Sequence, residues 1–196
     1  MTNEAEAALA YWARRKLGSF SLPREWSGRL ADRIVALGPR RVFEFVCNVG
    51  RHLVAIRERD PSIVLRGADI NVAAIRAGRR SGLDLAVGDE TYMARFADDE
   101  FDVAFTSSVI DHIPDPTLAL REMARIAPVF VLLEPWLGYE GKVGWVSKGV
   151  RATPFLYSWD YAARLPDHDV TSEPLPLRPE GVGPYYRLHV ACRRSA

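Results

Sequence analysis

The sequence predicts an α/β fold: a doubly wound, mostly parallel, seven-stranded sheet with an antiparallel last strand and helices on both faces. Short apolar runs alternate with amphipathic helical segments through residues 40–134. As strands, these runs would present apolar side chains on both faces of the sheet. Strands of this kind are typical of a parallel sheet covered on both faces, because right-handed crossovers place helices there. The final segment alternates polar and apolar residues, as an antiparallel strand does.

Composition predicts one globular domain over residues 1–196. The chain has 48% hydrophobic and 26% charged residues, which is enough to form a continuous core and excludes a disordered chain. Its 26 basic and 25 acidic residues are mixed, so we expect no nucleic-acid partner. Apolar runs fall well short of the roughly 18 residues that span a bilayer, so we expect no membrane partner either.

The first residues and the two cysteines indicate in which cellular compartment the protein is expected. The start, Met1–Glu4, lacks the basic and apolar regions of a signal peptide. Cys47 lies in an apolar run and Cys192 near the end, without partners at metal-ligand spacing. We therefore expect a cytoplasmic protein, a monomer or a homodimer, with no metal site.

Residues 1–38 predict two helices before the first strand. The segment 4–17 has apolar residues on one helical face, and so does the segment 23–37, which has Pro23 near its start and Gly38-Pro39 as a stop. The inward residues expected are Ala5, Ala8, Leu9 and Trp12 in the first helix, and Trp26, Leu30, Ile34 and Leu37 in the second.

Residues 40–134 predict the five parallel strands. They are expected at 42–46, 63–69, 83–87, 101–106 and 129–133. Helices are expected at 51–57, after Asn71, and after Asp115-Pro116, where an N-cap and a first-turn proline precede the inward residues Ala119, Leu120, Met123 and Ile126.

The last third of the sequence predicts a loop that covers the substrate site, followed by the final strands of the sheet. Residues 135–158 mix aromatic residues with glycines and predict a long loop, or lid, that binds substrate through Trp136, Tyr139, Trp145 and Tyr157. The alternative is that these aromatic side chains only cover the hydrophobic core of a small domain. In the segment 159–196 a short helix is expected at 159–165, and a strand at 185–191 is expected to pair antiparallel with one near 168–173.

Acidic and small polar residues gather where the predicted strands end. Glu44 lies in the first strand, Asp69 ends the second, and Asp89 follows the third. The fourth strand leads through Ser107 to Asp111-His112. In open α/β sheets the ligand binds at the carboxyl ends of the strands, and an acid ending the second strand can accept hydrogen bonds from ribose hydroxyls. Alone, each acid would be read as a helix cap or turn residue.

The turn after the first strand narrows the choice of nucleotide cofactor. A dinucleotide-binding G-x-G-x-x-G would need glycines at Val46, Asn48 and Arg51, which are all absent, so the turn does not predict an NAD site. A G-x-G-x-G pattern falls on Val46, Asn48 and Gly50, and keeps only the last glycine. Asparagine tolerates a left-handed conformation, whereas the β-branched Val46 predicts extended geometry or displacement of a bound ligand.

In order and spacing, these segments resemble the class I S-adenosylmethionine-dependent methyltransferases, a Rossmann-like family, over roughly residues 40–136. The segments that carry the resemblance are VFEFVCNVG, LRGADIN, LAVGDE, FDVAF with the following SVIDHIPD, and VLLEP. The departure is Val46, where the family has glycine. The cofactor implied by the resemblance is S-adenosyl-L-methionine, with S-adenosyl-L-homocysteine as its product.

The resemblance also implies roles for matching residues. Glu44 would face the methionine end, Gly50 would let the backbone approach the cofactor, and Asp69, followed by Ile70, would hold the ribose hydroxyls. The remaining cofactor contacts implied are Asn48 in the turn, Asp89 and Glu90 at the adenine, the backbone around Ser107 at the methionine ammonium, and Tyr11, with Trp12 as a second candidate, closing from the N-terminal helix.

Methyl transfer needs alignment of nucleophile and methyl in a dry site, because the sulfonium leaving group is already activated. A base is required only where the acceptor must lose a proton. His112 is the first candidate because an imidazole titrates near neutral pH, and Asp111 is the second; a structural role for His112 is the alternative.

The resulting hypothesis is methyl transfer to oxygen or nitrogen of a small metabolite, such as a sugar, an amino sugar or a secondary-metabolite intermediate. A second hypothesis treats Val46 and Asn48 as marks of an inactive binding or scaffold subunit. A third, action on RNA or protein, would need a basic groove, and Arg14-Arg15-Lys16 and Arg79-Arg80 are too small and scattered to form one.

Overall fold

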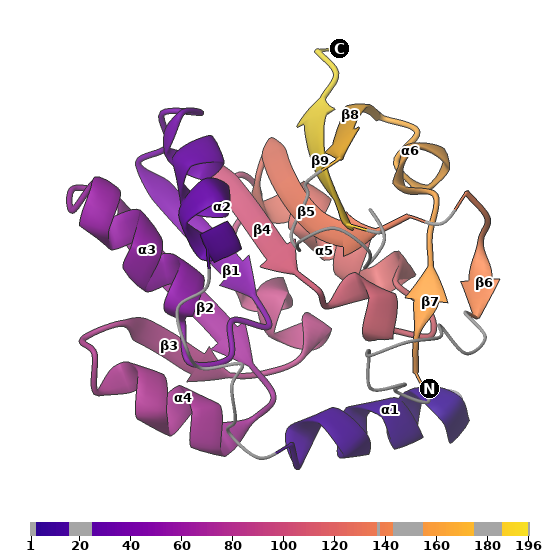
Figure 1. Cartoon of the computed structure of the whole chain (residues 1–196), viewed down its shortest axis with the longest axis horizontal. Helices are drawn as coiled ribbons and strands as arrows, with labels where there is room; N and C mark the ends of the chain where they lie inside the picture. The colour runs from indigo at the N-terminus through magenta and orange to yellow at the C-terminus, as the bar shows by residue number, and fades with distance from the viewer. Residues whose placement is uncertain (1–2, 16–24, 137, 143–154, 175–185, 196) are drawn as a thin grey trace.

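The computed structural model describes residues 3–15, 25–136, 138–142, 155–174 and 186–195 (Figure 1). Its main feature is a seven-stranded sheet with the order β3-β2-β1-β4-β5-β9-β8. Strands β1 to β5 are parallel, and β9 runs antiparallel to both neighbours, β5 and β8. The predicted fold class and the antiparallel last strand are confirmed. The strands are β1 Arg41–Phe45, β2 Val64–Asp69, β3 Asp84–Val87, β4 Val103–Ser107, β5 Val129–Pro135, β8 His168–Pro174 and β9 Tyr186–Arg193.

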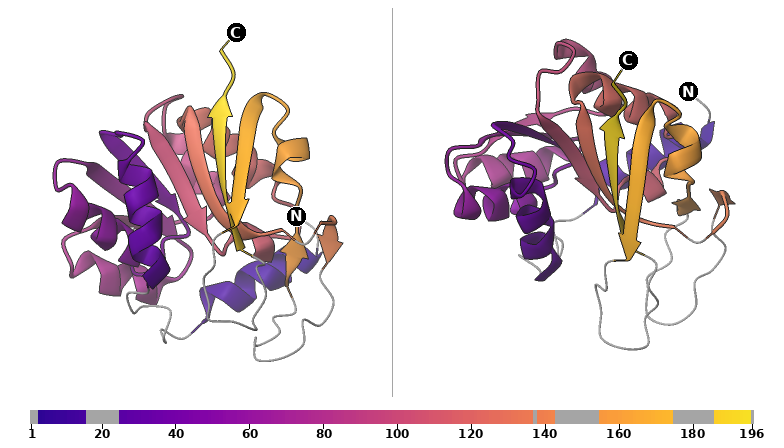
Figure 2. Two further views of the ribbon diagram at one scale, coloured as in Figure 1. Left: turned by 45° about the horizontal axis from the view of Figure 1, so that its top comes forward. Right: turned by 90° about the horizontal axis from the view of Figure 1, so that it is seen from above.

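Helices cover both faces of this sheet (Figure 2). One core lies on the side of α2 (Glu25–Val35), α3 (Arg51–Arg59) and α4 (Val72–Arg79). The other lies on the side of η2 (Glu90–Arg95), η3 (Ile110–His112), α5 (Thr117–Ile126) and α6 (Tyr161–Arg164). Strand β1 contributes to both cores, because its side chains alternate: Val42 enters the first core, while Phe43 and Phe45 enter the second.

Helix α1 (Asn3–Ala13) lies across the carboxyl ends of the parallel strands (Figure 1). Two contacts hold α1 and the residues just after it in this position. Asn71 Nδ2 donates to the carbonyl oxygen of Arg15 at 2.8 Å, and the Trp12 ring lies on His112 with 4.3 Å between ring centroids. The N-terminal segment therefore covers the carboxyl ends of the strands.

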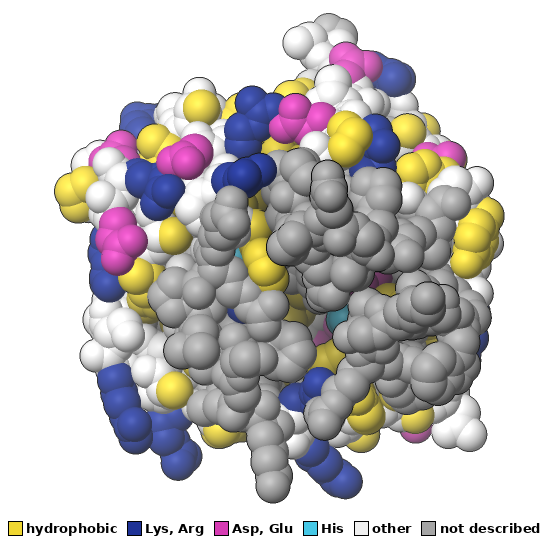
Figure 3. Space-filling model, viewed as in Figure 1, with side chains coloured by type: hydrophobic (Ala, Val, Ile, Leu, Met, Phe, Trp, Pro, Cys, Tyr) yellow, Lys and Arg dark blue, Asp and Glu magenta, His cyan; other side chains and the backbone are white. Residues whose placement is uncertain are grey.

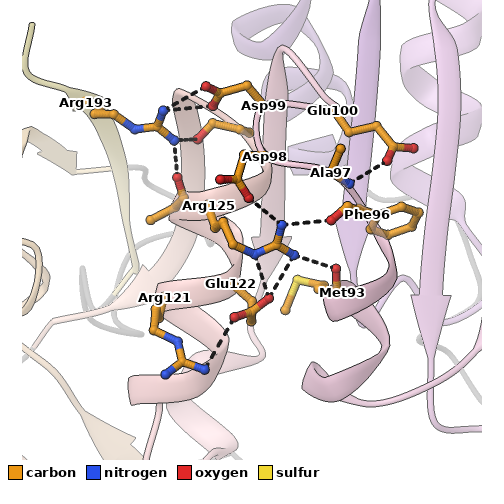
Figure 4. A network of polar contacts seen from close by, with 12 residues as sticks. Met93, Phe96, Ala97, Asp98, Asp99, Glu100, Arg121, Glu122, Arg125 and Arg193 are labelled. Carbon is orange, nitrogen blue, oxygen red and sulfur yellow. Dashed lines mark hydrogen bonds and ion pairs between the residues drawn. The ribbon is translucent and has the colours of Figure 1, made fainter.

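One arginine joins α5 to η2 and to the loop that follows it. Arg125 donates to the carbonyl oxygens of Met93 and Phe96, each at 2.8 Å, and pairs with Asp98 and Glu122 (Figure 4). This network holds η2 and the following loop against α5.

The structure corrects four local predictions. Helix α2 ends at Val35, so Leu37 lies beyond it and is 43% exposed instead of inward. At α5 the N-cap position belongs to Pro116, while the Asp115 side chain accepts from Thr117 N at 3.0 Å. The predicted lid is not a continuous loop, because β6 (Gly141–Lys142) pairs with β7 (Tyr157–Ser158). Helix α1 ends at Ala13, earlier than expected.

No helix in the described ranges has the length and apolar character needed to cross a membrane.

Candidate functional site

The turn that follows β1 has three left-handed residues at alternate positions. The φ angles are 56° at Val46, 53° at Asn48 and 75° at Gly50. These are the positions of the G-x-G-x-G pattern, so the turn has a glycine-type backbone although two glycines are missing. The left-handed conformation predicted for Asn48 is confirmed. The expectation of extended geometry at Val46 is wrong: the side chain packs against the core on the α5 side while the backbone takes a conformation rare for β-branched residues.

Asp69 joins this turn to the end of β2. Its Oδ2 accepts from Asn48 N and its Oδ1 from Asn71 N, each at 2.7 Å. The carbonyl oxygen of Asp69 in turn accepts from Gly88 N at 3.1 Å. The ends of β1, β2 and β3 are therefore tied together around one acid. Burial raises the pKa of Asp69, and the two backbone bonds oppose that rise.

Glu44 lies on β1 and is buried, with 2% of its surface exposed. Its Oε2 has no hydrogen-bond partner within the described part of the chain. Burial raises the pKa of Glu44 well above its usual value; the Arg51 guanidinium opposes this, and the charge of Asp69 adds to it. The charge of Asp69 thus acts on Glu44, and a shared cofactor role of the two acids stays a prediction.

Asp89 follows Gly88, whose N–H bonds the Asp69 carbonyl, and it caps η2 by accepting from Thr91 N at 2.9 Å. The half-buried Glu90 follows it, and burial raises the pKa of Glu90. Ile70, also half-buried, follows Asp69 directly. Capping η2 uses one carboxylate oxygen of Asp89. The contact of Asp89 with adenine stays a prediction.

The turn after β4 is held by an acid that sequence reasoning did not single out. Glu134, on β5, accepts from Val109 N at 2.9 Å and from Asp111 N at 3.3 Å. Asp111 is buried and also bonds Glu134 through its side chain. Burial raises the pKa of Asp111 to about 7. The signal available in the sequence was an acid closing an otherwise apolar strand.

His112 is enclosed on several sides. Its Nδ1 lies 2.8 Å from the carbonyl oxygen of Phe155, and because a carbonyl only accepts, this nitrogen carries the proton. Its Nε2 lies 3.6 Å from Asp111 Oδ1, and Trp12 stacks on the ring. Burial lowers the pKa of His112, which is therefore neutral at pH 7. The neutral form is the one that can accept a proton, at Nε2 only.

Of the other predicted contact residues, Tyr11 lies on α1 and Tyr157 contacts it. Tyr11 accepts from Arg15 at 3.2 Å and meets Phe155 edge-on at 5.8 Å between ring centroids. Tyr157, on β7, is buried, donates to Glu4 of α1 at 2.9 Å and stacks on Trp159. Trp136 is half-buried and Tyr139 is 48% exposed. Trp145 lies outside the described residues.

Ser107 ends β4, and its Oγ is buried without a partner among the residues that the structure describes. In the same residues no group of three His, Cys, Asp or Glu side chains could hold a metal ion. A pocket of about 310 Å³ opens elsewhere, on the face of the sheet beside η2. Its lining includes Arg66, Asp84 and Tyr92, and none of the residues at the strand ends described above.

Comparison with known proteins agrees with this arrangement. Residues 43–128 match a family model described as a methyltransferase domain. A demethylmenaquinone methyltransferase of Renibacterium salmoninarum is 25% identical over 108 residues, which are 55% of this chain and 45% of that protein. The chain thus matches less than half the length of this curated relative.

Solved structures share the fold over nearly the whole chain. The N-terminal domain of EvdMO1, crystallised with S-adenosylhomocysteine and D-fucose, has a TM-score of 0.66 at 16% identity, over 99% of this chain and 98% of that one. DesVI of Streptomyces venezuelae has a TM-score of 0.63 at 15% identity, over 86% and 92%. The 1,6-didemethyltoxoflavin-N1-methyltransferase of Burkholderia thailandensis has 0.63 at 16%, over 87% and 80%. Residues 43–128 therefore match a methyltransferase domain, and the sheet order over the described chain is the fold shared with these solved structures.

Proposed function

We propose that this protein transfers a methyl group from S-adenosylmethionine to an oxygen or nitrogen of a small metabolite, working as one domain in the cytoplasm. The observation that carries the proposal is Asp69 at the end of β2, bonded to the left-handed turn after β1. A carboxylate offers about four lone-pair sites. Two of those of Asp69 are used by backbone N–H groups, so two are left for ribose hydroxyls.

The residues at the strand ends fit the rest of the cofactor. Glu44 Oε2, Ser107 Oγ and Trp12 Nε1 are buried and have no partner within the described residues. Buried polar atoms are rarely left without partners, and such atoms are typical of sites that hold ligands or water. Glu44 and Ser107 would face the methionine part, Asp69 the ribose, and Asp89 with Glu90 the adenine.

When bound, S-adenosylmethionine supplies an activated methyl group. The chain has to align the acceptor with it and exclude water. Helix α1 covers the strand ends, with Trp12 against His112. Neutral His112 could take a proton from an acceptor hydroxyl or ammonium at Nε2, and Asp111 lies 3.6 Å from that nitrogen.

Aromatic side chains near α1 support a small acceptor. Tyr11, Trp12 and Phe155 contact one another or His112, and Tyr157 stacks on Trp159 nearby. On the face seen in Figure 3, the basic side chains of the described residues lie scattered among acidic and apolar ones, and do not form the continuous patch that RNA binding needs. The sugar and toxoflavin ligands belong to the neighbours and suggest only the class to screen.

The inactive-subunit alternative depended on Val46 and Asn48. Because both take glycine-type φ angles, their side chains do not by themselves argue for lost cofactor binding.

Isothermal titration calorimetry with S-adenosylhomocysteine tests the proposal. We expect a dissociation constant in the micromolar range, about −8 kcal/mol at 1 μM. Absence of both heat and a thermal shift, with either S-adenosylhomocysteine or S-adenosylmethionine, would contradict it. A screen of small hydroxyl and amine acceptors for release of S-adenosylhomocysteine then identifies the acceptor class.

A further inference from the structure

Glu134 is a fully buried acid that receives a run of backbone N–H groups. Its side chain is 0% exposed at the end of β5. Val109 N lies 2.9 Å from Oε1, Asp111 N lies 3.3 Å from Oε2, and the Ile110 amide also bonds to it. Successive amides that converge on one acid form a nest, and here the acid is a side chain of the next strand. Burial, followed by the charge of Asp111, raises the pKa of Glu134 well above its usual value, and the bonds from these amides oppose that rise.

The turn inside this nest has an unfavourable backbone. Ser108 has a φ of 56°, and its N–H donates to the carbonyl oxygen of Leu133 at 2.9 Å. A non-glycine residue in this region costs of order 1 kcal/mol and persists where the surroundings hold it. The Leu133 carbonyl and the Glu134 carboxyl group, at the end of β5, keep Ser108 in this conformation.

This turn carries the groups that the proposed function places at the reaction. It begins at Ser107, whose Oγ is buried without a partner in the described chain, and it leads into η3. The next residue after the nest, His112, has its ring held by Phe155 and Trp12. A shift of the turn would therefore move Ser107 and His112 together.

We propose that Glu134 is a positioning residue of the methyl-transfer site, whose carboxyl group fixes the turn Ser107–Asp111 and so sets the place of the Ser107 backbone and the His112 ring. This inference rests on the proposed function. Glu134 would act through the turn, because both of its carboxyl oxygens accept from amides of that turn.

Glu134→Gln tests it with little change of size. One acceptor oxygen becomes an NH₂ group, which cannot accept from a backbone N–H. We expect the dissociation constant of S-adenosylhomocysteine, measured by calorimetry, to rise about tenfold. We also expect amide hydrogen exchange of Val109 and Asp111, followed by NMR, to accelerate about tenfold while that of α4 stays unchanged.

Glu122→Gln is the matched control. Glu122 is also a buried acid, 7% exposed, but it pairs with Arg125 on α5 (Figure 4). A general loss of stability would lower the melting temperature of both variants, whereas only Glu134→Gln should weaken S-adenosylhomocysteine binding.

The outcomes separate the two proposals. If the wild-type protein binds no S-adenosylhomocysteine, the proposed function fails. If it binds, and Glu134→Gln binds equally with unchanged exchange at Val109 and Asp111, the positioning role is wrong. Should the variant not fold, the wild type still decides: slow exchange of these two amides and shifts of their resonances on ligand addition are expected, and fast exchange with no shift overturns the inference.

Discussion

The carboxylate of Asp69 accepts the backbone N–H of Asn48 at 2.7 Å, across the gap between the ends of β2 and β1. The same side chain bonds Asn71 N, at the start of α4. One acid therefore holds both the turn after β1 and the start of α4. It is a structural support and a candidate ligand-binding group at once, and its removal should affect both properties.

Replacing Asp69 with alanine should abolish cofactor binding and lower stability. One buried and one part-buried N–H group would lose their acceptor, which costs about 2 kcal/mol of the free energy of unfolding. Urea unfolding measures this loss, and calorimetry with S-adenosylhomocysteine should detect no binding. Asp84→Asn is the control, because this acid lies at the exposed start of β3 and pairs with Arg66. Retention of wild-type affinity by Asp69→Ala would remove the main support of the cofactor site.

Val46 should prefer glycine over alanine. At its φ of 56° an alanine is strained and a glycine is not, so Val46→Gly should be more stable than Val46→Ala by about 1 kcal/mol in urea unfolding. In an exposed helical position the order reverses: Ala73→Gly, on α4, should lose about 1 kcal/mol. Equal stability of the two Val46 variants would indicate that the backbone at this position is not left-handed in solution.

Asp111 should make stability fall as the pH rises. Its pKa in the folded protein is about 7, above the value near 4 expected for an unfolded aspartate. The folded state therefore holds a proton that the unfolded state has lost, and stability declines between pH 4 and 7 by up to about 1.4 kcal/mol per pH unit. Asp111→Asn should remove this part of the slope. Parallel stability curves for wild type and variant over this range would contradict the raised pKa.

Trp12 should keep His112 out of water. Burial is the main cause of the low pKa of His112, and Trp12 covers its ring. In Trp12→Ala we expect that pKa to rise toward 6.5, as followed by NMR titration of the histidine rings. Trp26→Ala, on α2 at the other core, should leave it unchanged. An unaltered His112 titration in Trp12→Ala would mean that α1 does not cover this site in solution.

Much of the fold could be predicted because its signals are local. The apolar run before Asp69 and the Asn71 side chain that accepts from Ala74 N at 3.1 Å are features of neighbouring residues, and they define β2 and the start of α4. The placement of Glu44, Asp69 and Asp89 at one end of the sheet followed from parallel topology. The antiparallel pairing of β9 was likewise visible in its alternation.

Contacts between distant segments could not be predicted in this way. The left-handed Val46 is held by packing against the second core and by the bonds around Asp69, neither of which a local propensity for valine contains. The Trp12 ring on His112 joins residues a hundred positions apart in sequence. The role of Glu134 depends on which amides lie within its reach, and only the folded turn brings them there.

The sequence by itself determined the order of the strands along the chain, the residues that end them and the family they resemble, because hydrophobic period and capping act over a few residues. The tertiary structure decided which polar atoms the protein satisfies internally, as at Asp69 and Glu134, and which remain without partners in the described chain, as at Glu44. The physical reason is that hydrogen bonding requires atoms within about 3 Å of each other, and this proximity arises only when the separate units pack together.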